Sequence, residues 1–162
     1  MPHYNVLFLC TGNSARSIMA EAIMNRKGAQ TFTAYSAGSH PSGTVRPEAI
    51  RQIENAGLSV ENFRSKSWDE FSKPDSPPLD FVFTVCDNAA NEVCPLWPGQ
   101  PMTAHWGIPD PGNAGEDQAT LERAFRDAFV TLDRRIGLFL SLPLASLDKL
   151  AIKREIDRIG QK

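Results

Sequence analysis

The sequence predicts an α/β protein: one three-layer domain with a four-stranded parallel sheet and helices on both faces of that sheet. Three observations favour this class. Short apolar runs typical of buried strands alternate along the chain with segments of helical periodicity. Gly, Pro and Asn residues mark breaks between these segments. A length of 162 residues suits one domain with a substantial core.

The first βαβ unit is predicted at the N-terminus. Residues 4–9 (YNVLFL) are almost continuously apolar after their first two positions, as expected for a buried strand. Residues 17–27 follow as a helix with an apolar stripe, and Gly28 ends it. Residues 31–36 then form a second strand, in which Thr, Phe and Tyr side chains favour extended structure.

A second helix and a long connection come next. Pro47 suits the first turn of a helix that runs to Gly57. Residues 58–79 contain three prolines, and Trp68 and Phe71 indicate a short helical turn that packs on the core. A connection of this length inside a compact domain is often functional.

Two further strands complete the predicted sheet. Residues 80–85 form the third strand and place Cys86 at its carboxyl end, and residues 102–106 form the fourth. A long helix follows over residues 117–140, with an apolar stripe composed of Leu121, Phe125, Ala128, Leu132, Ile136 and Phe139. The arginine pair at 134–135 is expected to complement the dipole of this helix.

Pro143 ends the long helix. Residues 144–159 are predicted as a last helix with Ser146 as its N-cap. Its apolar positions are Leu147, Leu150, Ile152 and Ile156. Its charged side chains are mixed in sign, which is typical of a solvated face rather than of a binding patch.

The composition excludes several classes of protein. A net charge of -2 and a pI of about 5.9 give no reason to expect nucleic acid or an anionic membrane as a partner. No apolar run reaches membrane-spanning length, and the N-terminus lacks the pattern of a signal peptide. Three cysteines do not form a secreted disulfide framework, and the three histidines lack zinc-site spacing. We therefore expect a soluble, cytoplasmic protein without a metal.

The most informative segment joins the first strand to the first helix. Cys10 ends the strand, and Arg16 and Ser17 begin the helix after five small or polar residues, which are Thr11, Gly12, Asn13, Ser14 and Ala15. Such residues let backbone N–H groups curl into a nest, and the helix adds the positive end of its dipole. The segment predicts an oxyanion site beside a thiol.

Arg16 and Cys10 would give this site its chemistry. The planar guanidinium of Arg16 can hold two oxygens of a tetrahedral anion. Its positive field is expected to lower the pKa of Cys10, and Ser17 is placed to donate a hydrogen bond to the resulting thiolate. A buried cysteine can also be a mere small hydrophobe. The strand, the Gly12–Asn13 loop and the helix around Cys10 favour an activated nucleophile.

Three motifs resemble the low-molecular-weight protein tyrosine phosphatase superfamily and, within it, the arsenate reductases. The first is residues 6–23 (VLFLCTGNSARSIMAEAI), and the second is residues 36–38 (SAG) with Pro47 downstream. The third, residues 105–111 (HWGIPDP), is similar to the acid loop of the reductases. On this resemblance, residues 1–142 are a phosphatase-like catalytic domain. Residues 143–162 lie beyond the resemblance, and we expect an extra C-terminal helix that packs on the same domain, with self-association as the alternative.

The resemblance implies a role for each reactive residue. Cys10 attacks arsenate held by the loop and Arg16, and Asp110 is the general acid that protonates the leaving oxygen. Cys86 then attacks Cys10 and arsenite departs. Finally Cys94 attacks Cys86, and an external thiol reductant, either thioredoxin or glutathione with glutaredoxin, reduces the Cys86–Cys94 disulfide. Because disulfide geometry requires Cα atoms about 5.5 Å apart, the segment between the two cysteines would have to rearrange.

The chain departs from the family pattern in two places. The gap between Cys86 and Cys94 is one residue longer than in the thioredoxin-coupled members, which leaves the reductant open. Some relatives bind a potassium ion beside the loop, and the positions that match here are Asn13, Glu21 and Ser36. The carboxylate expected near Ser65 is missing, so we predict no bound ion.

Two other functions compete with arsenate reduction. A phosphotyrosine phosphatase with a Cys10 phosphoenzyme would need aromatic side chains after the Asp-Pro pair, where this chain has Gly112, Asn113 and Ala114. Residual phosphatase activity is nevertheless expected, with phosphate or sulfate as mimics of arsenate. A non-catalytic phosphate-binding domain is disfavoured because Cys10, Arg16 and Asp110 are all present.

Overall fold

The computed structural model describes residues 3–61, 63–86, 97 and 100–162. Four parallel strands form one sheet in the order β2-β1-β3-β4, as the sequence predicts. The strands are β1 (Tyr4–Cys10), β2 (Phe32–Gly38), β3 (Phe81–Thr84) and β4 (Met102–His105). The helices are α1 (Arg16–Lys27), α2 (Pro47–Asn55), α4 (Gln118–Leu140) and α5 (Lys149–Ile159), with 3-10 turns η1 (Trp68–Phe71), η2 (Pro111–Asn113) and η3 (Leu144–Ser146).

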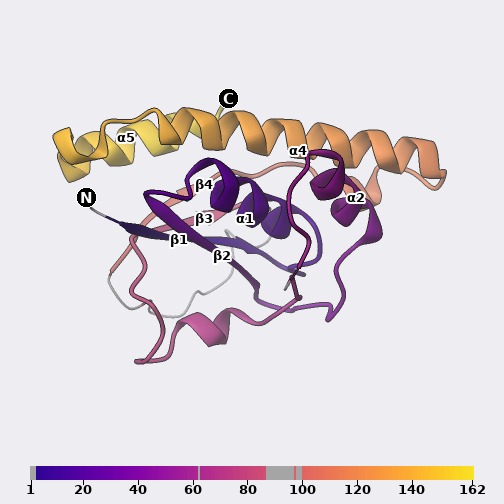
Figure 1. Cartoon of the computed structure of the whole chain (residues 1–162), viewed down its shortest axis with the longest axis horizontal. Coiled ribbons are helices and arrows are strands. Elements are labelled where there is room, and N and C mark those ends of the chain that lie inside the picture. The colour runs from indigo at the N-terminus through magenta and orange to yellow at the C-terminus, as the bar shows by residue number, and fades with distance from the viewer. Residues whose placement is uncertain (1–2, 62, 87–96, 98–99) are drawn as a thin grey trace.

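Both faces of the sheet are covered. Helices α1, α2, α4 and α5 lie on one face, and η1 lies on the other (Figure 1). The side chains of β1 divide between the two cores with the period of two that a strand imposes, Phe8 on the helical side and Leu9 on the η1 side. Burial on both faces explains why this strand reads as a continuous apolar run.

The strand register brings the reactive end of the sheet together. Cys10, the last residue of β1, pairs with Gly38 of β2, and Leu9 pairs with Thr84 of β3. The chain leaves β1 toward β2 and later returns to β3 on the other side of β1. Ligands of open α/β sheets bind at such a switch in strand order, at the carboxyl ends of the strands.

The C-terminal segment differs from the predicted helix. Residues 144–146 form a 3-10 turn, and α5 begins only at Lys149. Asp148 rather than Ser146 is the N-cap, because its Oδ1 accepts a hydrogen bond from the N–H of Ala151 at 2.8 Å. This later start turns Leu150 to solvent, where it is 68% exposed. The buried face of α5 consists of Ile152, Ile156 and Ile159.

No helix within the described residues has the length and apolar character needed to cross a membrane.

Candidate active site

The loop after β1 is fixed from outside through its carbonyl groups. The three pairs are His40 N–H to Thr11 O at 2.9 Å, Ser42 N–H to Gly12 O at 3.0 Å and Arg46 N–H to Ser14 O at 2.8 Å. In a trans peptide the carbonyl and the following N–H point in opposite directions. The N–H groups of Gly12, Asn13 and Ala15 therefore point away from these outer partners, toward the inside of the loop. This arrangement is a nest that can hold an anion.

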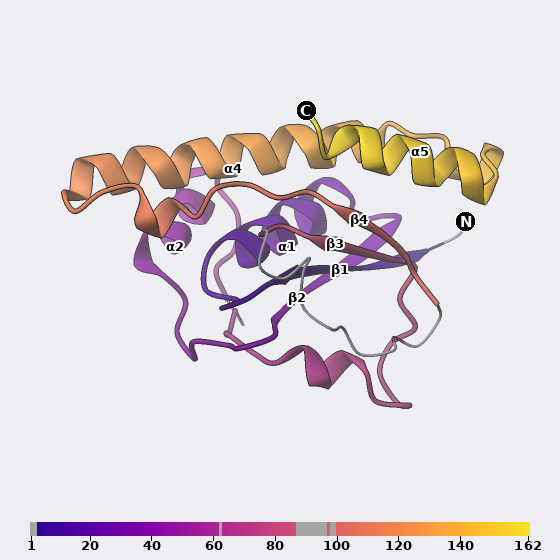
Figure 2. The same ribbon diagram turned by 180° about the vertical axis from the view of Figure 1, so that it is seen from behind.

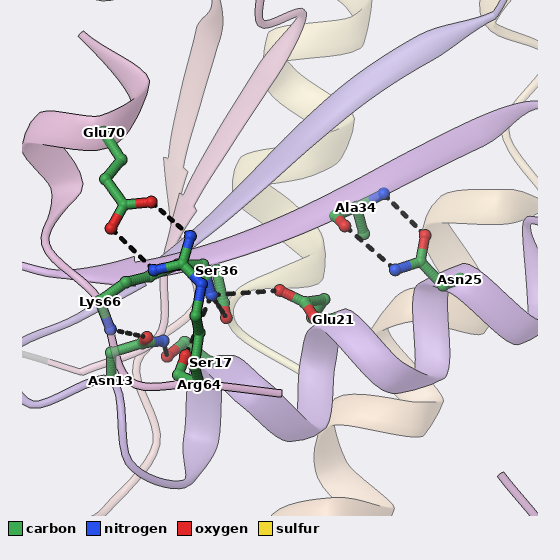
Figure 3. A network of polar contacts seen from close by, with 9 residues as sticks. All are labelled: Asn13, Ser17, Glu21, Asn25, Ala34, Ser36, Arg64, Lys66 and Glu70. Atoms are coloured by element: carbon green, nitrogen blue, oxygen red, sulfur yellow. Dashed lines mark hydrogen bonds and ion pairs between the residues drawn. The ribbon is translucent and has the colours of Figure 1, made fainter. Parts of the chain in front are cut away.

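Asn13 sets the curvature of the loop. Its φ of 45° lies in the left-handed region, which asparagine tolerates better than most residues. The side chain is fully buried; its Nδ2 donates to Ser17 Oγ at 2.8 Å, and its Oδ1 accepts from the N–H of Lys66 at 2.9 Å (Figure 3). Asn13 thus ties the loop both to α1 and to the connection before η1. The hydrogen bond from Ser17 to Cys10 stays a prediction.

A lysine lies beside Glu21 and Ser36, two of the positions that resemble a cation site. Lys66 Nζ is 3.9 Å from Glu21 Oε1 and 3.5 Å from Ser36 Oγ (Figure 3). Burial raises the pKa of Glu21, and the charge of Lys66 opposes that shift. Burial likewise lowers the pKa of Lys66, and Glu21 opposes it. The ammonium group therefore balances the carboxylate. Among the described residues no cluster of His, Cys, Asp or Glu could ligate a metal ion.

Cys10 and Cys86 are in contact where the loop begins. Both thiols are buried, and the N–H of Thr11 donates to Cys86 Sγ at 3.2 Å. A hydrogen bond between the two thiols and burial raise the pKa of Cys10, whereas the charge of Arg16 lowers it by less. The predicted fall in the pKa of Cys10 is therefore wrong for this arrangement, because the hydrogen bond with Cys86 and burial outweigh the charge of Arg16.

Arg16 links the loop to the segment that carries Asp110. Its Nη1 donates to the carbonyl oxygen of Ile108 at 2.9 Å, and its Nη2 is 3.9 Å from Asp110 Oδ2. Asp110 caps η2, since its Oδ1 accepts from the N–H of Gly112 at 2.9 Å. The carboxyl group is half-exposed and faces the guanidinium. Asp110 is thus placed next to the anion-binding end of Arg16.

Two arginines that sequence reasoning did not place in the site also support it. Arg46 pairs with the carboxylate of buried Glu48 through Nε at 3.2 Å and Nη2 at 3.0 Å, and its guanidinium lies against Gly112. Hydrogen bonds from Arg46 lower the pKa of Glu48 to about 2. Arg135 is 7% exposed, and its Nη1 donates to the carbonyl oxygen of Trp106 at 2.7 Å. The sequence predicts that Arg135 complements the dipole of α4. Arg135 lies one turn from Leu132 and Phe139 on the apolar stripe, and this position is the signal for its burial that sequence reasoning missed.

The structure brings most of the predicted site together. The residues that form the loop or lie beside it are Cys10, Thr11, Gly12, Asn13, Ser14, Ala15, Arg16, Ser17, Cys86 and Asp110. Cys94 lies outside the described residues. A buried thiol at the strand tip, an N–H nest, an arginine and a nearby carboxyl group form a device that can attack a tetrahedral oxyanion and protonate its leaving group.

Comparison with known proteins places this geometry in a family. The model of the low molecular weight phosphotyrosine protein phosphatase family matches residues 5–152. The chain belongs to this family. Among curated members, arsenate reductases from Halalkalibacterium halodurans and Oceanobacillus iheyensis are 33% and 34% identical over 134 residues, which is 83% of this chain and 93% of each relative. The resemblance found in the sequence is confirmed.

Solved structures of the family agree. An arsenate reductase in the phosphate binding state superposes with a TM-score of 0.68 at 27% identity, over 83% of this chain and 94% of that one. A thioredoxin-dependent arsenate reductase of Corynebacterium glutamicum gives 0.65 at 25% identity, over 90% of this chain and 64% of that one. A low molecular weight protein tyrosine phosphatase from T. tengcongensis, at 22% identity, shares the fold. The phosphatase-like α/β fold with its four-stranded parallel sheet is confirmed.

Proposed function

We propose that this family member is an arsenate reductase, in which Cys10 forms an adduct with arsenate and a relay of three thiols removes the oxidising equivalents. The observation that carries the proposal is the contact between the Cys86 and Cys10 thiols at the loop. Hydrolysis of a phosphate ester needs one thiol in the loop. A second thiol in contact with the first is what a two-electron reduction requires. The names of the relatives point the same way.

The first step is nucleophilic attack. The N–H nest and Arg16 hold the oxyanion, and the Cys10 sulfur bonds to arsenic while one oxygen leaves as water. Asp110 supplies a proton to that leaving oxygen. Because the charge of Arg16 lowers the pKa of Cys10 and the contact with Cys86 raises it, separation of the two thiols favours the Cys10 thiolate. Entry of the anion between them would provide that separation.

The second step transfers two electrons to arsenic. The Cys86 thiolate attacks the Cys10 sulfur, a disulfide forms, and the electron pair of the sulfur–arsenic bond goes to arsenic. Arsenic(V) becomes arsenic(III), and arsenite leaves the loop. Cys94 then attacks Cys86, which frees the Cys10 thiolate and moves the disulfide to Cys86–Cys94. Each exchange breaks one bond to sulfur and forms another, so the two electrons come finally from an external dithiol or from glutathione.

The reductant would be thioredoxin or glutathione with glutaredoxin. Both keep thiols reduced in the cytoplasm, which is where we place the protein. The thioredoxin-dependent relative from Corynebacterium glutamicum favours thioredoxin as the first system to test. The site needs no bound cofactor for these steps.

Arsenate-dependent NADPH consumption tests the proposal, with thioredoxin and thioredoxin reductase in one arm and glutathione, glutaredoxin and glutathione reductase in the other. We expect turnover in at least one arm. Cys86→Ser and Cys94→Ser are expected to abolish turnover yet leave hydrolysis of 4-nitrophenyl phosphate largely intact, whereas Cys10→Ser abolishes both. Mass spectrometry of the oxidised protein is expected to find a Cys86–Cys94 disulfide. No arsenate turnover in either arm, with fast aryl phosphate hydrolysis, would contradict the proposal.

That contrary outcome would identify a phosphotyrosine phosphatase, which the family description favours as the second candidate. The positions of the tyrosines argue against it. Tyr4 stacks on Phe32 at the start of the sheet, and Tyr35 packs on Phe71 on the η1 side. Beside Asp110, Gly112 faces the guanidinium of Arg46 instead of an aromatic wall. We therefore expect slow phosphatase activity without selectivity for phosphotyrosine.

A further inference from the structure

The second half of helix α5 lies outside the family model, which ends at residue 152, and it contacts the rest of the protein. Lys153 donates a hydrogen bond from Nζ to the carbonyl oxygen of Thr103 in β4. Ile156 accepts a hydrogen bond from Trp106, and Gly160 lies against His105 and Trp106 at the end of β4. The helix therefore lies along the last strand of the sheet (Figure 2). This strand leads directly into the loop of residues 106–111.

Trp106 is the point where α5 meets that loop. Its indole N–H donates to the carbonyl oxygen of Ile156 at 2.9 Å, in the last turn of α5. Gly160 allows this close approach. A Cβ atom there would clash with the carbonyl oxygen of His105 and would lie 2.9 Å from Cδ1 of Trp106. The end of the helix is therefore pressed against the backbone where the loop begins.

The other sides of Trp106 are fixed by the core and by α4. The side chain is fully buried, and its ring stacks on Phe83 with centroids 3.9 Å apart at 16°. Phe139 of α4 meets the same ring edge-on at 6.0 Å. The guanidinium of Arg135 holds the carbonyl oxygen of Trp106 at 2.7 Å. The indole N–H is the only polar group of the Trp106 side chain, and its partner lies in α5. The position of α5 therefore sets the position of Trp106.

A displacement of Trp106 would be transmitted to Asp110. Only three residues separate them, and prolines on both sides of Asp110 fix the backbone φ of their own positions. Between them, the carbonyl oxygen of Ile108 accepts the hydrogen bond from Arg16 at 2.9 Å. The distance of 3.9 Å between Arg16 and Asp110 depends on this short, stiff segment.

We propose that α5 is a positioning element for the general acid: by holding Trp106, it sets the place of Asp110 relative to Arg16 and the Cys10 loop. The inference rests on the proposed function, since it takes Asp110 as the acid. An acid matters most when the leaving group is a poor one. Disturbing α5 should therefore impair reactions of poor leaving groups selectively.

Trp106→Phe tests this, because phenylalanine keeps an aromatic ring but cannot donate to Ile156. We expect kcat/KM for phenyl phosphate, a poor leaving group, to fall about tenfold more than for 4-nitrophenyl phosphate. Gly160→Ala is expected to act in the same direction. Trp68→Phe, on the opposite face of the sheet, is the matched control and should leave the ratio unchanged.

The Asp110→Asn background separates positioning from a general loss of structure. If α5 acts through Asp110, Trp106→Phe has no further effect on the substrate ratio in that background. An equal loss with both substrates, or a change of ratio that persists in Asp110→Asn, would overturn the proposal.

Hydrogen exchange gives a readout that needs no activity. We expect the Ile108 amide, which donates to Val85 O at 3.1 Å, to exchange about tenfold faster in Trp106→Phe at an unchanged urea midpoint. Unchanged exchange would overturn the inference. A full-length protein that neither reduces arsenate nor cleaves aryl phosphates would refute the proposed function instead, and the exchange measurement would still decide the role of α5.

Discussion

Gly38 of β2 offers a sharp test of how tightly the oxyanion loop is built, because it has no reactive group of its own. A Cβ atom at this position would lie 2.5 Å from Thr11 O, 3.0 Å from Asn13 N and 3.1 Å from Asn13 Cβ. All three atoms belong to the loop, and Thr11 O is already held by the N–H of His40. Gly38→Ala therefore pushes the loop itself rather than the end of a flexible side chain.

The size of the effect follows from these distances. Restoring the Thr11 contact from 2.5 Å to an ordinary 3.4 Å moves the loop backbone or β2 by about 0.9 Å. Misplacement of a catalytic group by about 1 Å costs roughly 100-fold in rate. Overpacking of this kind costs about 1–3 kcal/mol of unfolding free energy. We expect Gly38→Ala to lower kcat/KM for arsenate and for 4-nitrophenyl phosphate by about 10- to 100-fold, with phosphate affinity falling in parallel.

Gly137→Ala in α4 is the matched control. The nearest atom to a Cβ there is Lys27 Nζ at 3.9 Å, so the methyl group has room. Replacing glycine by alanine inside a helix is expected to stabilise the protein by about 0.5–1 kcal/mol without changing kcat/KM. Steady-state kinetics and urea unfolding on both variants give the comparison. Wild-type kcat/KM in Gly38→Ala would refute the idea that close contact with β2 shapes the loop.

Three further predictions concern titrating groups. Cys86→Ala removes the hydrogen bond that raises the pKa of Cys10, so alkylation of Cys10 by iodoacetamide should become half-maximal at a lower pH than in the wild type. Folding lowers the pKa of Glu48 from 4.5 to about 2, so the Glu48 carboxylate stabilises the fold above pH 4.5 and loses that effect as the pH falls through 2. Urea unfolding of Glu48→Gln should therefore show about 1–2 kcal/mol less stability than the wild type near neutral pH and no difference in strong acid. This magnitude includes a discount for the guanidinium partner, which is partly exposed. Lys66→Met leaves the Glu21 carboxylate without its partner and should lower the free energy of unfolding by about 1–3 kcal/mol. Because burial already raises the pKa of Glu21, this loss of stability should grow as the pH rises above 4.5. A loss that does not change with pH would contradict the pairing.

The local parts of the fold could be predicted from the sequence because their signals are local. The run that ends at Cys10, the small residues of the loop and the helix that follows specify one strand–loop–helix unit, and the structure has it as β1 and α1. Asp148 was missed as a cap because the serine two positions before it is an equally good cap by type. The start of α5, and with it the choice between Ser146 and Asp148, depends on how Ile156 packs in the core.

Buried charges could not be predicted in the same way. Lys66 resembles an ordinary surface residue in the sequence, and Arg135 is marked only by its place on the apolar stripe of α4. Each meets a partner far from it along the chain, Glu21 for the lysine and the Trp106 carbonyl for the arginine. The identity of such partners depends on tertiary contacts that no periodicity encodes. The pKa of Cys10 was misjudged for the same reason, since the effect of Arg16 is visible in a motif but the approach of another thiol is not.

The choice between hydrolysis and reduction therefore depends on what touches Cys10 rather than on the loop alone. The proposed N–H nest and Arg16 would hold any tetrahedral oxyanion of suitable size, phosphate and arsenate alike. A phosphoenzyme is resolved by water, so hydrolysis of a phosphate ester does not require a second thiol beside the nucleophile. Arsenate reduction does require one, because its adduct is resolved by sulfur within the same site. The contact of Cys86 with Cys10 is therefore the strongest structural argument for arsenate as the substrate.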